Sequence, residues 1–173
     1  MKKIFCMALS AALLAGSVPA YAAEESLFTK TPHTFTARVG TTEFTKDGEA
    51  QPLDVAIYIK DGYTMLPLRT FMKAALGEKS QMAWNNEDKA ATVAFGGNLI
   101  RFSIKENTIA KNGKDLPVWG KMEVKDGRVF VPLRNWSGIL QSIGYLMEEG
   151  DITWDSTTRL ATVRAVEQKL DPS

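Results

Sequence analysis

Two segments of the chain repeat one pattern of residues, and this repeat constrains the fold more than any other feature. Residues 60–69, with the sequence KDGYTMLPLR, align with residues 125–134, KDGRVFVPLR, at a shift of 65 positions. Further along, Ala-Trp-Asn at 83–85 aligns with Thr-Trp-Asp at 153–155 at a shift of 70 positions. Such a repeat predicts two related units that jointly enclose a single apolar interior.

Each unit is expected to contain short strands, tight turns and one helix. Asp-Gly and Asn-Gly pairs between apolar runs favour tight hairpins, because both residues tolerate positive φ angles. The proline of each Pro-Leu-Arg motif favours a helix start, because its missing N–H would have no partner there. We therefore expect one helix from Leu68, capped by Gly77, and a second from Leu133 to Ile143, ended by Gly144.

The two aligned tryptophans, Trp84 and Trp154, each begin a strand that returns through Ala-Thr-Val, and their matched positions predict a core role. Together these signals predict an α+β fold, in which antiparallel β-sheets wrap two short helices with a pseudo-twofold internal repeat. The domain is expected over 35–167, with units at about 35–97 and 98–167. The residues expected to serve this fold first are Pro67, Leu68, Arg69, Trp84, Pro132, Leu133, Arg134 and Trp154.

The first 22 residues have the features of a signal peptide. Lys2 and Lys3 precede an apolar run that is too short to span a bilayer comfortably, and the run ends at Ala20-Tyr21-Ala22. We expect cleavage after Ala22, and a secreted or extracytoplasmic location (cell surface or periplasm) without a membrane-embedded segment. Residues 23–34 are expected to form a flexible leader and residues 168–173 a tail.

Composition narrows the chemistry of the exported chain. The signal peptide carries two of the 21 lysines and arginines and none of the 20 acids, which leaves 19 basic and 20 acidic residues. This near-neutral balance lacks the positive charge that nucleic-acid binding requires. The only cysteine, Cys6, leaves with the signal peptide, and His33 alone cannot supply the ligands of a transition-metal site. We therefore expect no catalytic residue, no metal site and no cofactor, and we interpret His33 as a solvated linker residue.

The repeated motifs also resemble a known family. Leu66-Pro67-Leu68-Arg69 and Val131-Pro132-Leu133-Arg134, each followed by a helix and then Trp-Asn or Trp-Asp, resemble the copper amine oxidase N-terminal-like domain, or stalk domain. The resemblance covers roughly Phe35 to Val166. It implies antiparallel sheet wrapped on helix and a non-catalytic module of exported bacterial proteins. It does not imply copper, which in amine oxidases belongs to a separate and larger catalytic domain.

The repeated arginines, Arg69 and Arg134, are candidates for either a structural or a binding role. A cation in the first turn of a helix faces the positive end of the helix dipole, so each arginine should have a compensating partner. Asp61 and Asp126 recur with the arginines and are the partners we expect first. The alternative is that the two guanidinium groups hold an anion or a glycan.

Trp119 is the third candidate binding residue. At the shift of 65 positions its counterpart is Asp54, so no repeated core position requires an aromatic side chain there. Burial against the second helix is one expectation. Exposure is the other, in which case Trp119 could stack on sugar rings or anchor a partner.

These observations predict an exported, non-catalytic binding or scaffolding module, whose partner is a cell-wall glycan or another exported protein. The alternative is a secreted, carboxylate-dependent hydrolase acting on glycans, for which the acidic run at 148–151 is the densest source of carboxylates. A purely structural protein of the cell envelope is a third possibility.

Overall fold

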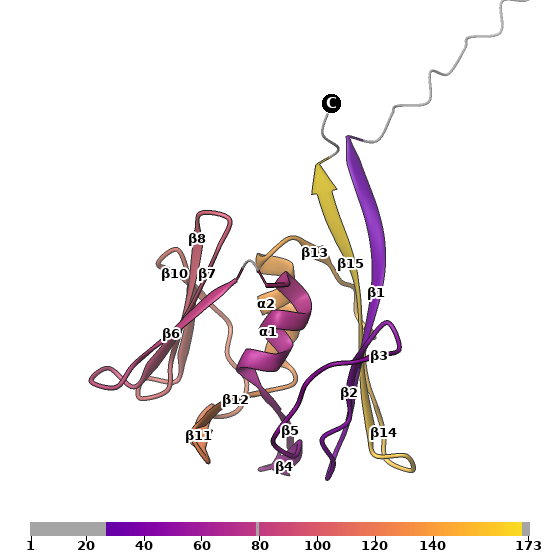
Figure 1. Cartoon of the computed structure of the whole chain (residues 1–173), viewed down its shortest axis with the longest axis horizontal. Helices are drawn as coiled ribbons and strands as arrows, with labels where there is room; N and C mark the ends of the chain where they lie inside the picture. Colours follow the sequence, from indigo (N-terminus) through magenta and orange to yellow (C-terminus); the bar gives the residue numbers. More distant parts are fainter. Residues whose placement is uncertain (1–26, 79, 171–173) are drawn as a thin grey trace, which may run out of the picture.

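The computed structural model describes residues 27–78 and 80–170, so the predicted signal peptide at 1–22 lies outside the described residues. Antiparallel sheets surround two short helices (Figure 1), which confirms the predicted α+β class. The elements in chain order are β1 (Phe28–Arg38), β2 (Phe44–Lys46), β3 (Glu49–Ala50), β4 (Tyr58–Lys60), β5 (Tyr63–Pro67), α1 (Leu68–Leu76), β6 (Gln81–Asn85), β7 (Ala90–Phe95), β8 (Asn98–Ser103), β9 (Thr108–Lys111), β10 (Lys114–Leu116), β11 (Glu123–Lys125), β12 (Arg128–Pro132), α2 (Asn135–Ser142), β13 (Tyr145–Leu146), β14 (Ile152–Asp155) and β15 (Leu160–Leu170).

The strands of the described residues form three sheets. The first has the order β13-β15-β1-β2-β3, with β14 also paired to β15, and the second has the order β10-β9-β8-β7-β6. The third sheet has the order β11-β12-β5-β4, and its two central strands end at Pro67 and Pro132, the prolines of the two Pro-Leu-Arg motifs. In Figure 1 the two helices lie between the first two sheets, and the third sheet lies across one end of the molecule.

Strand pairing brings residues of the two aligned segments together. In the third sheet Leu66 of β5 lies opposite Val131 of β12, and these positions are 65 apart. In the first sheet Phe35 lies opposite Val163, and in the second sheet Ile100 lies opposite Val93. Phe35 aligns with Ile100 at the shift of 65 residues, and Val93 aligns with Val163 at the shift of 70. The first and the second sheet therefore contain the same pair of aligned positions, and each has strands from both predicted units.

The helices meet at the centre of the apolar interior. The Phe71 ring of α1 and the Trp136 ring of α2 stack with centroids 3.9 Å apart, and both side chains are fully buried. Phe35 and Phe44 extend this aromatic cluster from the first sheet, at 5.0 Å and 5.5 Å from Phe71. Because positions 71 and 136 are also 65 apart, one shared core joins the two segments.

Local signals set the ends of α1 as predicted, whereas α2 begins later than predicted. Pro67 is the N-cap of α1, and the Gly77 N–H donates to the Lys73 carbonyl at 2.7 Å to close its last turn. After Pro132 the chain first makes a turn through Leu133, whose carbonyl accepts the N–H of Trp136 at 3.0 Å. The helical residues therefore start at Asn135.

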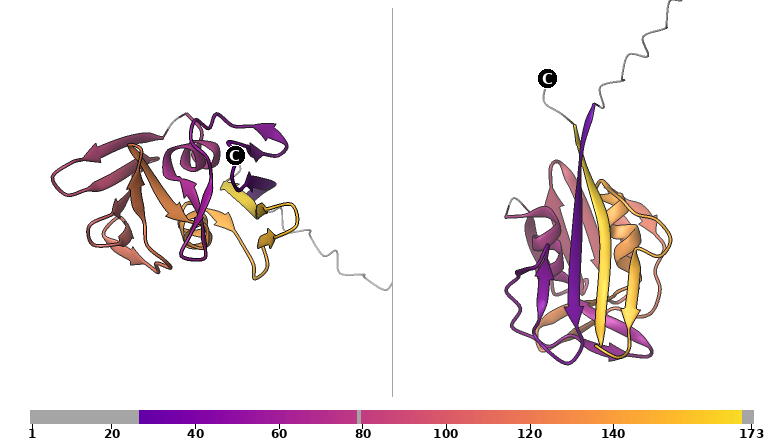
Figure 2. Two further views of the ribbon diagram at one scale, coloured as in Figure 1. Left: turned by 90° about the horizontal axis from the view of Figure 1, so that it is seen from below. Right: turned by 90° about the vertical axis from the view of Figure 1, so that its right-hand side faces the viewer.

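The predicted leader and tail are wrong over their described parts, because these parts pair with each other. β1 and β15 form a continuous antiparallel ladder that runs from Phe28 opposite Leu170 to Arg38 opposite Leu160. Residues 28–34 and 168–170 therefore belong to strands rather than to a leader and a tail. Figure 2 shows this two-stranded ribbon extending beyond the body of the protein.

Candidate binding grooves

Two grooves flank the third sheet and contain every candidate binding residue. The smaller one, of about 800 Å³, is lined by Trp119, Arg134 and Trp154, and we call it the Trp119 groove. The larger one, of about 1330 Å³, is lined by Arg69 and Trp84, and we call it the Trp84 groove. The structure thus brings Trp119 and Arg134 together and places Arg69 at a separate site.

Both tryptophans that were predicted to lie in the core are instead half-exposed in these grooves. Trp84 and Trp154 are each 42% exposed. Each lies opposite a buried alanine of the next strand, Ala91 for Trp84 and Ala161 for Trp154. The indole rings therefore cover small side chains from outside, and one part of each ring remains open to solvent.

Trp119 is not buried against α2, so the structure supports exposure rather than burial. The residue is 39% exposed and lines the groove named after it. Trp154 of β14 and Tyr63 of β5 also line this groove, which therefore has three aromatic side chains from three segments of the chain. Aromatic surfaces of this kind offer a large apolar contact area together with a polar edge.

The backbone of Trp119 is fixed by Asn135, a buried polar residue at the start of α2. The Trp119 N–H donates to Asn135 Oδ1 at 2.7 Å, and Asn135 Nδ2 donates to the Trp119 carbonyl at 2.9 Å. Asn107 holds the following residues in the same way, through the Gly120 carbonyl and the Met122 N–H, both at 3.0 Å. These four hydrogen bonds set the position of Trp119.

Gly120 itself is required by close packing against the aromatic lining. It adopts φ +70°, and a Cβ there would lie 2.9 Å from the ring of Tyr63. Sequence reasoning identified Trp119 but missed Asn135, Asn107 and Tyr63. An amide one residue past the second Pro-Leu-Arg motif was the only available signal for Asn135.

The two grooves are built from matching parts of the chain. Arg134 and Trp154 of the Trp119 groove align with Arg69 and Trp84 of the Trp84 groove. The lining of the Trp119 groove also includes the hairpin residues 61–64, and that of the Trp84 groove includes the matching stretch at 127–129. Each groove thus combines a helix start and a tryptophan strand from one segment with a hairpin from the other.

The predicted partners of the two arginines do not bind them. Within residues 27–78 and 80–170, no hydrogen bond or ion pair joins the side chain of Arg69 or Arg134 to another residue, and both residues are exposed. Asp61 and Asp126 instead occupy left-handed turn positions, with φ of 50° and 49°. The repeated aspartates therefore serve the hairpin turns, and the guanidinium groups face the grooves without a protein partner.

The Trp119 groove carries excess negative charge. Arg134 faces three carboxylates in its lining, those of Asp61, Glu148 and Glu149, which gives a net charge of −2. The acidic run that was considered for a hydrolase therefore lies in the same groove as Trp119. Together with the aromatic rings, these groups can accept and donate hydrogen bonds to a hydroxyl-rich ligand.

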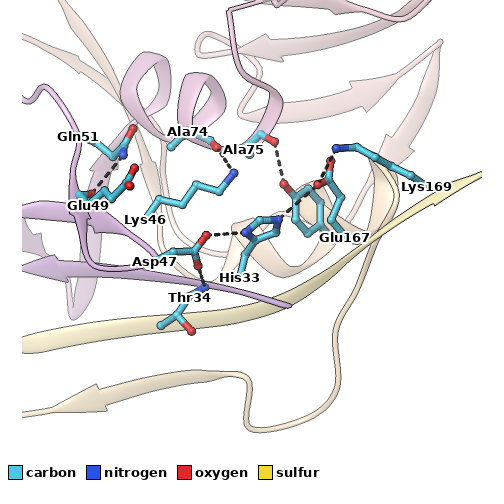
Figure 3. Close-up of polar contacts among 11 residues, drawn as sticks. His33, Thr34, Lys46, Asp47, Glu49, Gln51, Ala74, Ala75, Glu167 and Lys169 are labelled. Atoms are coloured by element: carbon cyan, nitrogen blue, oxygen red, sulfur yellow. Dashed lines mark hydrogen bonds and ion pairs between the residues drawn. The ribbon is translucent and has the colours of Figure 1, made fainter. Parts of the chain in front are cut away.

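His33 is not the solvated linker residue that the sequence predicted. Its side chain is only 11% exposed, with Nδ1 2.6 Å from Asp47 Oδ2 and Nε2 3.3 Å from Glu167 Oε2 (Figure 3). Desolvation raises the pKa of Asp47, but the hydrogen bonds from His33 and the Thr34 N–H outweigh it and hold that pKa below its usual value. His33 thereby connects β1 to the turn after β2 and to β15.

Among the residues that the structure describes, no group of three or more histidine, cysteine, aspartate or glutamate side chains is placed to hold a metal ion. In the same residues, none of the helices is both long and apolar enough to cross a bilayer.

Comparison with known proteins agrees with the motifs and the fold. The family model for the copper amine oxidase N-terminal domain matches residues 45–163, which is more than half of the chain. No curated protein and no solved structure matches the chain. In the amine oxidases this domain is a non-catalytic, stalk-like part. The chain belongs to the copper amine oxidase N-terminal domain family.

Proposed function

We propose that the protein is an exported, non-catalytic binding or scaffolding module that holds a glycan in the Trp119 groove. Export is supported by the signal-peptide features of residues 1–22. A non-catalytic role is supported by the family, whose domain is a stalk-like part of larger oxidases.

The glycan assignment rests on the presence of two half-exposed tryptophans in one groove. Trp119 and Trp154 offer apolar ring faces, which stack on the C–H faces of sugars. Arg134 adds an unpaired donor and Glu148 an acceptor, which suit the hydroxyl and amide groups of a sugar chain. A protein partner would use the same aromatic anchors, and the experiment below separates the two ligands.

The groove is also largely formed before any ligand arrives. Asn135 and Asn107 fix the loop that carries Trp119, and Tyr63 packs against Gly120. A fixed platform loses little conformational entropy on binding, so more of the contact energy appears as affinity.

The test is calorimetric titration of the signal-less protein with chitohexaose, a neutral sugar chain. Trp119→Ala and Trp154→Ala should each weaken binding by about tenfold, the loss expected for a central aromatic anchor. Trp84→Ala is the matched control, since it removes an equally exposed tryptophan from the other groove and should leave the affinity unchanged.

Three results would contradict the proposal. Unchanged affinity in Trp119→Ala would remove the groove from glycan binding. Capture of an exported protein through Trp119, with no affinity for chitohexaose or purified cell wall, would replace the glycan by a protein ligand. Cleavage of the glycan, abolished by Glu148→Gln, would establish the hydrolase alternative, because that carboxylate lines the same groove.

A further inference from the structure

We propose that the Trp84 groove is a second binding site, specific for an acidic polysaccharide. This inference goes beyond the proposed glycan site of the Trp119 groove and does not depend on glycan binding there. It rests on the positive charge of the Trp84 groove and on its exposed tryptophan.

Positive charge dominates the lining of the Trp84 groove. Four cations, Arg69, Lys73, Lys89 and Arg128, face two carboxylates, Asp54 and Glu78, which gives a net charge of +2. The two carboxylates already have partners, because Asp54 pairs with Arg128 and Glu78 lies 3.3 Å from Lys73. The excess positive charge therefore lies on Arg69 and Lys89.

Arg69 and Lys89 are available to a ligand. The Arg69 side chain has no hydrogen bond or ion pair within the described part of the chain, and Lys89 Nζ donates only to the neutral Asn86 amide oxygen, at 2.7 Å. A planar guanidinium binds a carboxylate through two parallel hydrogen bonds, which fixes the orientation of the acid group. A guanidinium–carboxylate pair of this geometry favours a ligand whose acid groups are held in a fixed orientation by a rigid backbone.

Trp84 can contact the rigid backbone of such a ligand. Its ring is half-exposed in the same groove and lies across from Ala91, which is too small to cover it. A sugar ring can stack on this face while its acid group reaches Arg69. An acidic polysaccharide satisfies both requirements, whereas a simple polyanion without rings would use only the cations.

The two grooves are lined by matching segments of the chain but differ in charge. Arg128 of the Trp84 groove stands at the position of Tyr63 in the Trp119 groove, and Asp54 stands at the position of Trp119. These two exchanges cancel in charge, so the difference comes from other lining residues. Lys73 and Lys89 add positive charge to the Trp84 groove, which carries +2, and the carboxylates of Asp61, Glu148 and Glu149 leave the Trp119 groove at −2. The negative charge of the Trp119 groove repels an acidic polysaccharide, and the positive charge of the Trp84 groove attracts one, so the acid form should bind in the Trp84 groove.

The test is titration of the signal-less protein with oligogalacturonate and with its methyl ester, which has the same rings without the charge. We expect binding of the acid form, weakened by added salt because the contacts are ionic, and at least tenfold weaker binding of the ester. Arg69→Gln should weaken binding of the acid form about tenfold, as expected for loss of a charge-assisted pair.

The aligned residues of the Trp119 groove provide matched controls. Arg134→Gln and Trp154→Ala should leave oligogalacturonate binding unchanged, whereas Trp84→Ala should weaken it. All four residues are exposed, so each variant should remain folded, and melting curves of the four variants check this.

Two results would overturn the inference. Oligogalacturonate affinity that survives both Arg69→Gln and Trp84→Ala would exclude this groove. Equal affinity for inorganic polyphosphate, lost in Arg69→Gln and retained in Trp84→Ala, would show general attraction of polyanions instead of recognition of a polysaccharide. Chitohexaose binding is measured in parallel, so a failure here is distinguishable from a failure of the Trp119 site.

Discussion

Replacing Phe71 by alanine tests whether the two predicted units share one core. Phe71 is fully buried and contacts three aromatic rings, those of Trp136 at 3.9 Å, Phe35 at 5.0 Å and Phe44 at 5.5 Å. Truncation of a buried phenylalanine costs about 3–5 kcal/mol, and loss of an aromatic pair adds about 0.5–1.5 kcal/mol. A loss of about 4 kcal/mol is a large part of the 5–15 kcal/mol that stabilises a typical domain.

The measurement is urea unfolding, followed by far-UV circular dichroism and by tryptophan fluorescence. For Phe71→Ala we expect both signals to move together to a lower midpoint, because the ring contacts elements of both segments. Leu99→Ala is the control, since Leu99 is an exposed apolar side chain and its loss should change the free energy of unfolding by less than about 0.5 kcal/mol. A loss below about 1 kcal/mol for Phe71→Ala, or separate transitions for the two signals, would refute the shared core.

Two further variants test individual groups. Trp136→Phe should lower the free energy of unfolding clearly less than Phe71→Ala does. The indole Nε1–H of Trp136 is buried without a hydrogen-bond partner in the described structure, so its removal relieves a penalty of about 1–3 kcal/mol. A loss in urea unfolding larger than that of Phe71→Ala would contradict this. His33→Gln tests the pH dependence. The pKa of Asp47 is lower in the folded state than in the unfolded state, so the ionised carboxylate stabilises the fold. This stabilisation is complete at pH values above the pKa of the unfolded state, and it is lost as the pH falls through the pKa of the folded state. The drop in unfolding free energy between about pH 6 and about pH 3 should therefore be smaller in His33→Gln than in the wild type, and an equal drop would exclude the His33–Asp47 contact as a cause.

The sequence predicted those elements whose signals are local. The ends of α1 follow from Pro67 and Gly77, which act within one turn of the helix. The family followed from paired motifs of a few residues each. The start of α2 was misplaced, because Pro132 is followed by a turn before the helical residues begin.

Features that depend on distant pairing could not be predicted. Residues 28–32 are exposed and polar along most of their length, so they show no burial pattern, and they are strands only because β15 pairs with them. His33 was assigned to solvent for the same reason, since Glu167 lies 134 positions away in the sequence. Distance along the chain, rather than weak local preference, limited these predictions.

The sequence singled out the residues that line the two grooves but did not predict their surroundings. A tryptophan between apolar strands has the same pattern whether it fills a core or covers it from outside, so the exposure of Trp84 and Trp154 was not predictable. For the repeated arginines the sequence left two roles open, a structural pair with the recurring aspartates or the binding of an anion or a glycan. In the structure those aspartates form turns, and the arginines line two grooves of opposite charge.

The most direct test of the account uses the four tryptophan indole N–H signals in ¹⁵N-labelled protein. Addition of chitohexaose should shift the signals of Trp119 and Trp154, and oligogalacturonate should shift that of Trp84. The signal of Trp136 should respond to neither sugar, because that ring is fully buried. If both sugars move the same signals, or if Trp84, Trp119 and Trp154 all remain in place, the two-groove account is wrong.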